Sequence, residues 1–187
     1  IFFGDNIQIA KRGVALDIGL LGGNLKVRRA TVKDLAGAAF QLSGSARDLA
    51  RKITAQGKVK VTAKNPSGLF RLAGLNLPFP AERLGKFALD GSIGGAAGRL
   101  DLDLKLQAGR NRLGAKGWLA DPITDPKVEL VLNLANPSHS NLMRLFDPAF
   151  QPAGKGLDGA IDLRGKLAGS LDGLKLDFTA GLAKARL

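Results

Sequence analysis

Apolar and polar residues alternate along much of the chain. The clearest run is 100–107, in which Leu100, Leu102, Leu104 and Leu106 alternate with polar residues. A period of two places these leucines on one face of a β-strand and the polar residues on the other, which is typical of a strand with one wet face. The same alternation predicts further strands whose apolar residues share one face: Val59, Val61, Leu130, Leu132, Leu134, Ile161, Leu163, Leu174, Leu176 and Phe178. Gly, Asn and Asp between the runs predict turns, so we expect a mainly β, antiparallel architecture.

Two short helices are predicted to interrupt the strands. Each begins at an Asn-Pro-Ser triplet, 65–67 and 136–138, with Asn predicted as the N-cap and Pro as the first helical residue. Gly74 is predicted to end the first helix, and Asp147 with Pro148 the second. Apolar residues at helical spacing are expected to cover part of the sheet. They are Leu69, Leu72, Leu142 and Leu145.

An internal repeat is suggested by matching segments. The two triplets lie 71 positions apart, and segment 44–48 resembles segment 117–121, at an offset of 73. Segment 89–93 matches 163–167 at an offset of 74. Offsets that drift by a few residues are typical of duplicated units with loop insertions. We therefore expect an N-terminal strand segment (1–43) and two units (44–116 and 117–187) within one continuous β architecture.

The residue types do not assemble a catalytic site. The chain has no Cys and a single His, so thiolate metal sites and histidine clusters are excluded. His139 adjoins Ser138 and Ser140, but neighbouring helical residues do not face each other, so we interpret them as the first turn of a helix. Asp101 and Asp103 share one face with Arg99 and Lys105, which favours a charge-balanced wet surface over a carboxylate dyad. We expect no enzyme activity, no metal and no cofactor.

Net charge and hydropathy limit the classes of partner that the chain is expected to bind. The formal net charge of +12 favours anionic partners, but only 5% of residues are aromatic and none is Tyr. Single-stranded nucleic-acid binding relies on aromatic stacking, so nucleic acid is not expected as a partner. No apolar stretch approaches the roughly 18–20 residues of a membrane span, so any membrane anchor is expected outside this chain.

The chain resembles the AsmA family of Gram-negative envelope proteins, which includes TamB-like and YhdP-like members. The resemblance covers essentially the whole chain and is carried by degenerate glycine-turn and leucine-strand motifs: segments 22–25, 34–38, 40–45, 98–103 and 113–117, and the stretch from Pro137 to Leu145. It implies an elongated sheet curled into an open, apolar-lined groove. It also implies a periplasmic protein, anchored in the inner membrane, that supports phospholipid transport between the membranes and outer-membrane assembly. Phospholipid is the implied partner, with envelope proteins as possible others.

The apolar face of such a sheet needs a cover. Two short helices are too small for it, so either a second sheet packs against the face or the face stays open and lipid fills it. An acyl chain exposed to water loses about 0.8 kcal/mol per CH₂, so a continuous aliphatic surface would ease its passage between membranes. The alternatives are a closed β-sandwich, acting as a scaffold or protein-interaction module of the envelope, and a nucleic-acid-binding β domain. Bound lipid would separate the first reading from the second, and salt-dependent oligonucleotide binding would reveal the third.

Overall fold

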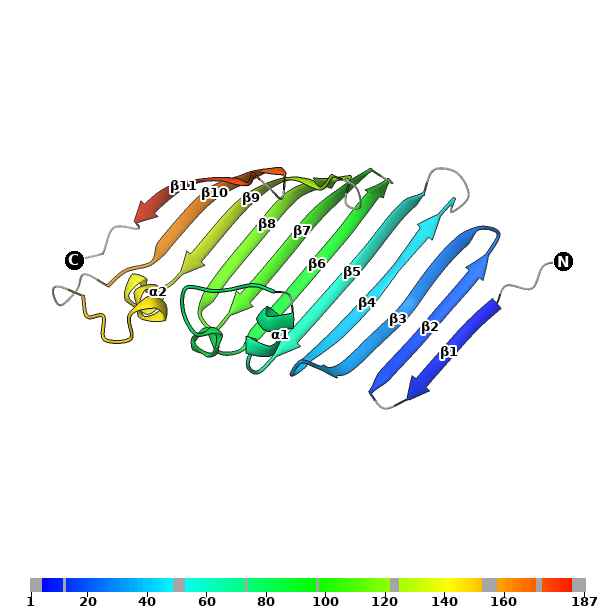
Figure 1. The fold of residues 1–187 in the computed structure, drawn as a ribbon, viewed down its shortest axis with the longest axis horizontal. Coiled ribbons are helices and arrows are strands. Elements are labelled where there is room, and N and C mark those ends of the chain that lie inside the picture. The colour runs from blue at the N-terminus through cyan, green and yellow to red at the C-terminus, as the bar shows by residue number, and fades with distance from the viewer. Residues whose placement is uncertain are drawn as a thin grey trace.

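The computed structural model consists of one antiparallel sheet of eleven strands, and the strand order in the sheet equals the order in the chain (Figure 1). The structure describes residues 5–11, 13–48, 53–72, 74–96, 98–121, 125–152, 158–170 and 173–182. The mainly β, antiparallel fold predicted from alternation is thereby confirmed. The strands are β1 (Asp5–Lys11), β2 (Val14–Leu21), β3 (Asn24–Leu35), β4 (Ala38–Arg47), β5 (Thr54–Ala63), β6 (Phe87–Ala96), β7 (Arg99–Ala108), β8 (Asn111–Ala120), β9 (Lys127–Asn136), β10 (Ile161–Ser170) and β11 (Lys175–Leu182).

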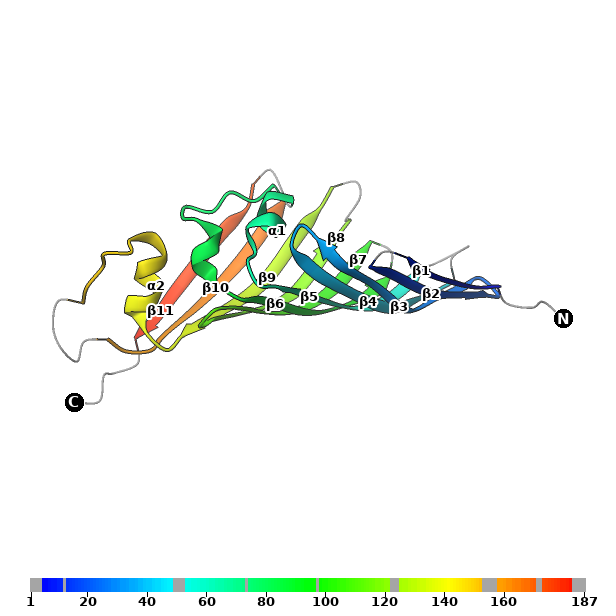
Figure 2. The ribbon, with the colours of Figure 1, turned by 90° about the horizontal axis from the view of Figure 1, so that it is seen from below.

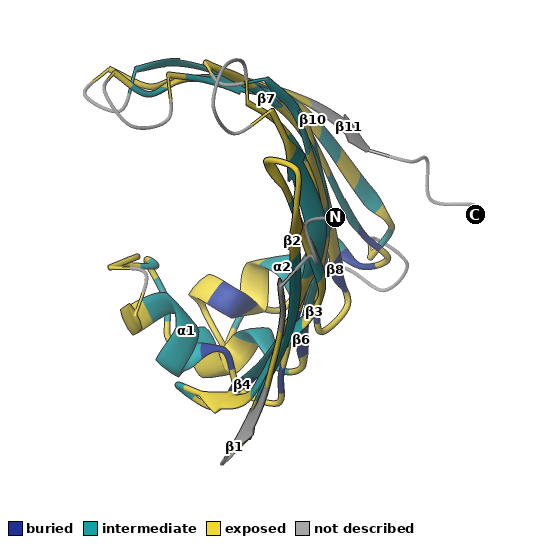
Figure 3. Ribbon diagram, turned by 90° about the vertical axis from the view of Figure 1, so that its right-hand side faces the viewer, coloured by how far each residue is buried: buried dark blue, intermediate teal, exposed yellow. Residues whose placement is uncertain are grey.

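Two insertions carry the helices. α1 (Ser67–Leu72) and a 3₁₀ turn, η1 (Ala81–Leu84), connect β5 to β6, and α2 (His139–Phe146) connects β9 to β10. Both insertions lie on the same side of the sheet (Figure 2). The strands bend along their length, and the helices lie on the inner side of the bend, near one end of the strands (Figure 3).

The helix starts differ from the prediction. The N-cap of α2 is Ser138, whose hydroxyl accepts a hydrogen bond from the Asn141 N–H at 3.0 Å, and the first helical residue is His139. Asn136 is instead the last residue of β9, and its side-chain oxygen accepts the Ser138 N–H at 2.8 Å. The prediction of Asn as N-cap and Pro as first helical residue is therefore wrong for α2, and it is also wrong for α1, which begins at Ser67. In both, Asn forms a turn with the residue two positions on.

The helix ends match the prediction. α2 ends at Phe146, directly before Asp147. Gly74 follows the end of α1 with a φ of 66°, and the Leu75 N–H closes the turn on the Phe70 carbonyl at 2.9 Å. A left-handed residue after the last turn is a common helix stop, and Gly adopts it without steric cost.

Two irregularities in β3 keep its apolar residues in phase. The β3–β4 register shifts between Val27 and Ala30 and again between Val32 and Leu35. Each shift is a bulge that places two polar residues between two apolar ones, so both apolar residues still face the same way. The extra residue of the first bulge, Arg28, binds Asp17 on β2 through two nitrogens, at 2.9 Å and 2.6 Å.

Glycines permit close contact between neighbouring strands. A Cβ on Gly117 of β8 would lie 1.9 Å from the Glu129 carbonyl oxygen of β9, and one on Gly44 of β4 would lie 2.5 Å from the Gln56 carbonyl oxygen of β5. Only glycine fits such a backbone approach. Gly44 and Gly117 are the residues that the repeat aligns, and the turns after them contain Asp48 and Asp121 with φ of 54° and 45°. The internal repeat stays a prediction, with which these paired features are consistent.

Candidate functional site: a partly exposed apolar face

The strand register brings the predicted apolar residues onto one face of the sheet. Leu102 of β7 lies opposite Ile93 of β6 and Gly117 of β8, and the same alternation continues along and across the strands. We call this surface the apolar face and the opposite surface the polar face. The predicted residues that the register places on the apolar face are Val59, Val61, Leu100, Leu102, Leu104, Leu106, Leu130, Leu132, Leu134, Ile161, Leu163, Leu176 and Phe178. Leu174, also predicted there, lies directly before β11 and has no partner in the strand register.

The apolar face extends further toward the N-terminus than sequence reasoning predicted. Register pairing from β5 to β1 adds Phe40, Leu42, Leu35, Val32, Ala30, Val27, Leu25, Leu20, Ile18, Leu16, Val14 and Ile7. The bulges hid β3, because in the runs 27–30 and 32–35 two polar residues separate the apolar ones. The signal that could have found them is the repeated pattern of apolar, two polar, apolar, read as a bulged strand.

The α1 insertion covers one end of this face. Ala38, Val61, Ala63, Phe87 and Ala108 form a buried cluster at the helix end of β4 to β7. Three residues of the insertion, Leu69, Phe70 and Leu84, pack against it, and the Phe70 and Phe87 rings meet edge to face at 6.0 Å.

The predicted covering residues of the helices divide into two groups. Leu69 packs on the buried cluster and Leu145 of α2 is itself buried, while Leu142 is partly buried. Leu72 is 60% exposed, which contradicts its predicted covering role. It lies in the last turn of a six-residue helix, where the chain already turns away toward Gly74.

The two insertions are joined to each other. The Arg83 guanidinium donates hydrogen bonds to the carbonyls of Leu145 and Phe146, at 2.9 Å and 3.2 Å, at the C-terminal end of α2. The Phe79 and Phe146 rings meet edge to face at 5.0 Å. A cation at a helix C-terminus is favourable because the last carbonyls carry partial negative charge. The insertions therefore form a connected wall along one side of the apolar face.

Much of the remaining apolar face is open to solvent. Leu42 is 48% exposed, Leu176 50% and Phe178 57%. Ten strand spacings of about 4.8 Å and strands about 33 Å long give the whole face, including the end beneath the insertions, an area of about 1,600 Å². Soluble monomers rarely expose large contiguous apolar patches, and those that they do expose are often binding surfaces. Within the described residues, the whole β structure is this one sheet, and no second sheet covers the face.

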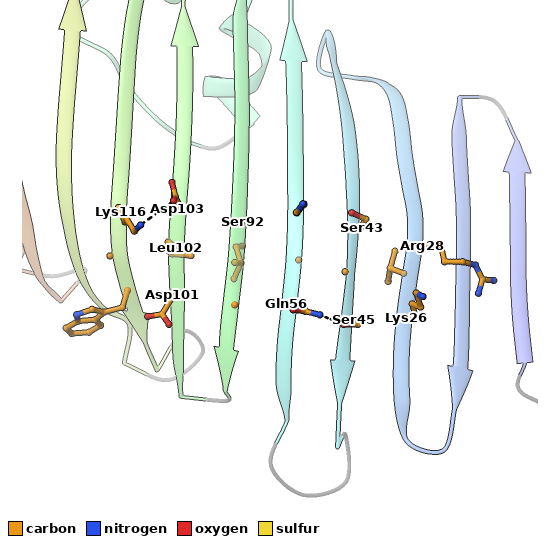
Figure 4. Close-up of a pocket in the computed structure, with 18 residues that line it drawn as sticks. Lys26, Arg28, Ser43, Ser45, Gln56, Ser92, Asp101, Leu102, Asp103 and Lys116 are labelled. Atoms are coloured by element: carbon orange, nitrogen blue, oxygen red, sulfur yellow. Dashed lines mark hydrogen bonds and ion pairs between the residues drawn. The ribbon is translucent and has the colours of Figure 1, made fainter.

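The polar face is a lattice of charged and hydroxyl side chains. Lys116 pairs with Asp103 at 3.6 Å and the Gln56 amide donates to the Ser45 hydroxyl at 3.2 Å (Figure 4). Both pairs border an open hollow of about 1100 Å³ that crosses β3 to β8. Nearby, the hydrogen bond from Arg28 lowers the pKa of Asp17 below its usual value. The solvated, charge-balanced surface predicted for Asp101 and Asp103 is consistent with this arrangement, in which Asp101 lies 4.0 Å from Arg99.

The residues around His139 form a helix cap. The Ser138 hydroxyl donates to Asp158 at 2.7 Å, and Asp158 also accepts the Ser140 N–H at 3.1 Å. His139 Nδ1 accepts the Gly159 N–H at 3.3 Å and lies 3.3 Å from the Asp158 carboxylate, to which the Ser138 hydroxyl donates. The bond from Ser138 lowers the pKa of Asp158. This geometry fixes the start of α2, as the interpretation of a first helical turn requires.

The first insertion begins with the same hydrogen bonds. The Asn65 side-chain oxygen accepts the Ser67 N–H at 2.9 Å, as Asn136 does for Ser138. The Ser67 hydroxyl donates to the carboxylate of Glu82 at 2.6 Å, which lowers the pKa of Glu82. In the second insertion the Asn136 amide also donates to Asn111 at 2.7 Å. Two polar residues of the apolar face, Asn111 and Asn136, are thus buried and bonded to each other beside the insertions.

Neither a metal site nor a membrane-spanning helix is found among the described residues. The described residues contain no cluster of three or more His, Cys, Asp or Glu that could hold a metal, and no helix among them is long and apolar enough to cross a membrane. Comparison of the chain with protein-family models, curated proteins and solved structures finds no match.

Proposed function

We propose that the apolar face binds the acyl chains of phospholipids and carries them across the aqueous space between the two membranes of a Gram-negative envelope, in support of outer-membrane assembly. The observation that carries this proposal is the extent of the apolar face. It continues across all eleven strands, and much of it is exposed. Periplasmic location, with a membrane anchor outside this chain, belongs to the same proposal.

The energetics favour such a role. A sixteen-carbon acyl chain in water loses about 12 kcal/mol relative to an apolar environment, at about 0.8 kcal/mol per CH₂. The apolar face offers contact along about 48 Å, the width of ten strand spacings. Its aliphatic side chains make no directional bonds, so a chain meets no strong stopping point. Asn111 and Asn136 do not interrupt this path, because they are buried beside the insertions.

The wall of insertions gives the site an orientation. It closes the apolar face at one end of the strands and leaves the other end open (Figure 3). An amphipathic ligand would keep its headgroup in water at the open end while its acyl chains lie on the leucines. The rival is an envelope scaffold in which a partner protein covers the same face.

A charge on the apolar face tests the proposal. Leu102→Asp places a carboxylate between Ile93 and Gly117, in the path of the acyl chains. Val131→Asp is the matched control, because it also replaces an aliphatic residue by Asp, at a position that is 51% exposed on the polar face between Lys116 and Lys166. The proteins are incubated with phosphatidylethanolamine–phosphatidylglycerol vesicles and re-isolated, and bound phospholipid is counted by native mass spectrometry.

We expect phospholipid on the wild type and on Val131→Asp, and loss of most of it from Leu102→Asp. Melting curves should show that both variants are folded. Absence of phospholipid from the wild type, or equal amounts on both variants, would contradict the proposal. Absence of lipid together with a protein partner that protects Leu102 would favour the scaffold.

A further inference from the structure

The polar face pairs lysines with carboxylates across neighbouring strands. Lys60 lies 3.5 Å from Asp90, Lys116 3.6 Å from Asp103, and Lys166 2.9 Å from Glu129. Opposite charges on cross-strand neighbours stabilise a sheet, and like charges destabilise it. We therefore expect lysines elsewhere on the polar face to lie opposite carboxylates as well.

This pairing of opposite charges is interrupted where the α1 insertion joins β5 and β6. Ala63 is the last residue of β5 and pairs with Phe87, the first residue of β6. The next residues outward, Lys64 and Lys86, therefore lie opposite each other at the two ends of the insertion. They line an open hollow of about 840 Å³ together with a third lysine, Lys33, from the second bulge of β3.

The hollow holds an excess of positive charge. Asp34 is the only carboxylate among its lining residues, so three lysines and one carboxylate leave two positive charges. Within the described part of the chain, Lys33, Lys64 and Lys86 form no ion pair. Thr62 and Gln107 add a hydroxyl and an amide as hydrogen-bond donors. We call this site the lysine hollow.

We propose that the lysine hollow binds a phosphate group. A phosphate between Lys64 and Lys86 would turn a repulsive cross-strand pair into an attractive one, and ammonium groups bind phosphate as compact point charges. The hollow lies on the polar face, so this site is separate from the apolar face and does not rest on the function proposed for it. A phospholipid headgroup at a membrane surface and free phosphate share the required chemistry.

The test compares two double variants of the same charge. Lys64→Gln with Lys86→Gln removes two positive charges from the lysine hollow. Lys60→Gln with Lys116→Gln removes two from paired lysines elsewhere on the polar face. Binding is measured by sedimentation with phosphatidylcholine vesicles containing phosphatidylglycerol, and by calorimetry with inorganic phosphate.

We expect the first double variant to bind about thirtyfold more weakly, since each lysine near an anionic surface contributes about fivefold. The control should lose less than fivefold, and Asp34→Asn should bind more tightly than the wild type. Calorimetric binding of inorganic phosphate, lost in the first variant, would identify a free-anion site. Vesicle binding that inorganic phosphate does not displace would identify a headgroup site. Equal losses in the two double variants, or no binding to either ligand, would overturn the proposal.

Discussion

Replacing either of two residues of the apolar face, Val61 or Leu102, by Asp tests which part of the face is covered in solution. Val61 is 6% exposed beneath the α1 insertion, whereas Leu102 is partly exposed in the open part. A carboxylate at position 61 must become neutral on folding, because burial disfavours the charged form. Keeping an Asp with an ordinary pKa near 3.9 neutral at pH 7 costs about 4 kcal/mol, at 1.36 kcal/mol per pH unit. At position 102 the carboxylate reaches water, so we expect a loss of only about 1 kcal/mol of leucine packing.

Thermal melting measures the difference in stability between the two variants. A domain of this size loses about 2–4 °C per kcal/mol, so Val61→Asp should melt roughly 8–16 °C below the wild type and Leu102→Asp roughly 2–4 °C below. The pKa of the buried Asp is raised on folding, so its destabilisation grows as the pH rises above about 4 and disappears below it. The two variants should therefore melt closer together at pH 4 than at pH 7. A Leu102→Asp variant that melts as low as Val61→Asp, with the same pH dependence, would refute the open apolar face.

Three further predictions concern the fold itself. Gly117→Ala should lower the melting temperature by roughly 2–12 °C, because overpacking costs about 1–3 kcal/mol. Gly114→Ala on the same strand should leave the melting temperature unchanged or slightly higher, because the nearest neighbouring atom to an added Cβ lies 4.0 Å away. Asn136→Ala should cost about 2–3 kcal/mol in urea unfolding, because it leaves the buried Asn111 oxygen without its donor, and the exposed Asn65→Ala should cost less. Because the pKa of Asp158 is lower in the folded state than its ordinary value of 3.8, the ionised carboxylate stabilises the fold above pH 3.8, and this stabilisation is lost as the pH falls through the folded pKa. Asp158→Asn should therefore reduce the free energy of unfolding at pH 7 but not at pH 2. Equal reductions at the two pH values would contradict the cap.

The alternation of β7 was sufficient to predict a strand and both of its faces, because its period of two has no interruption from Leu100 to Leu106. The same reasoning did not place the apolar residues of β3 on this face, since two bulges shift the register and change the period locally while these residues still face the same way. Asn136 was assigned to a helix cap because the local sequence Asn-Pro-Ser suits one. Its hydrogen bond to Asn111, 25 positions away, is a tertiary contact that a local pattern does not contain. The lysine hollow was hidden for the same reason, because Lys33, Lys64 and Lys86 come together only through strand pairing.

The identity of strand order and chain order bears on how the molecule gains and loses structure. In the described part of the chain, strands pair by backbone hydrogen bonds with their neighbours in the sequence, so the sheet is a one-dimensional array of hairpins. In such arrays stability is close to a sum of nearest-neighbour terms, and ordering can begin at any hairpin and spread outward. Amide hydrogen exchange should then be graded, slowest in the central strands beneath the α1 insertion and progressively faster toward β1 and β11. Loss of a terminal strand would shorten the array without unravelling its centre.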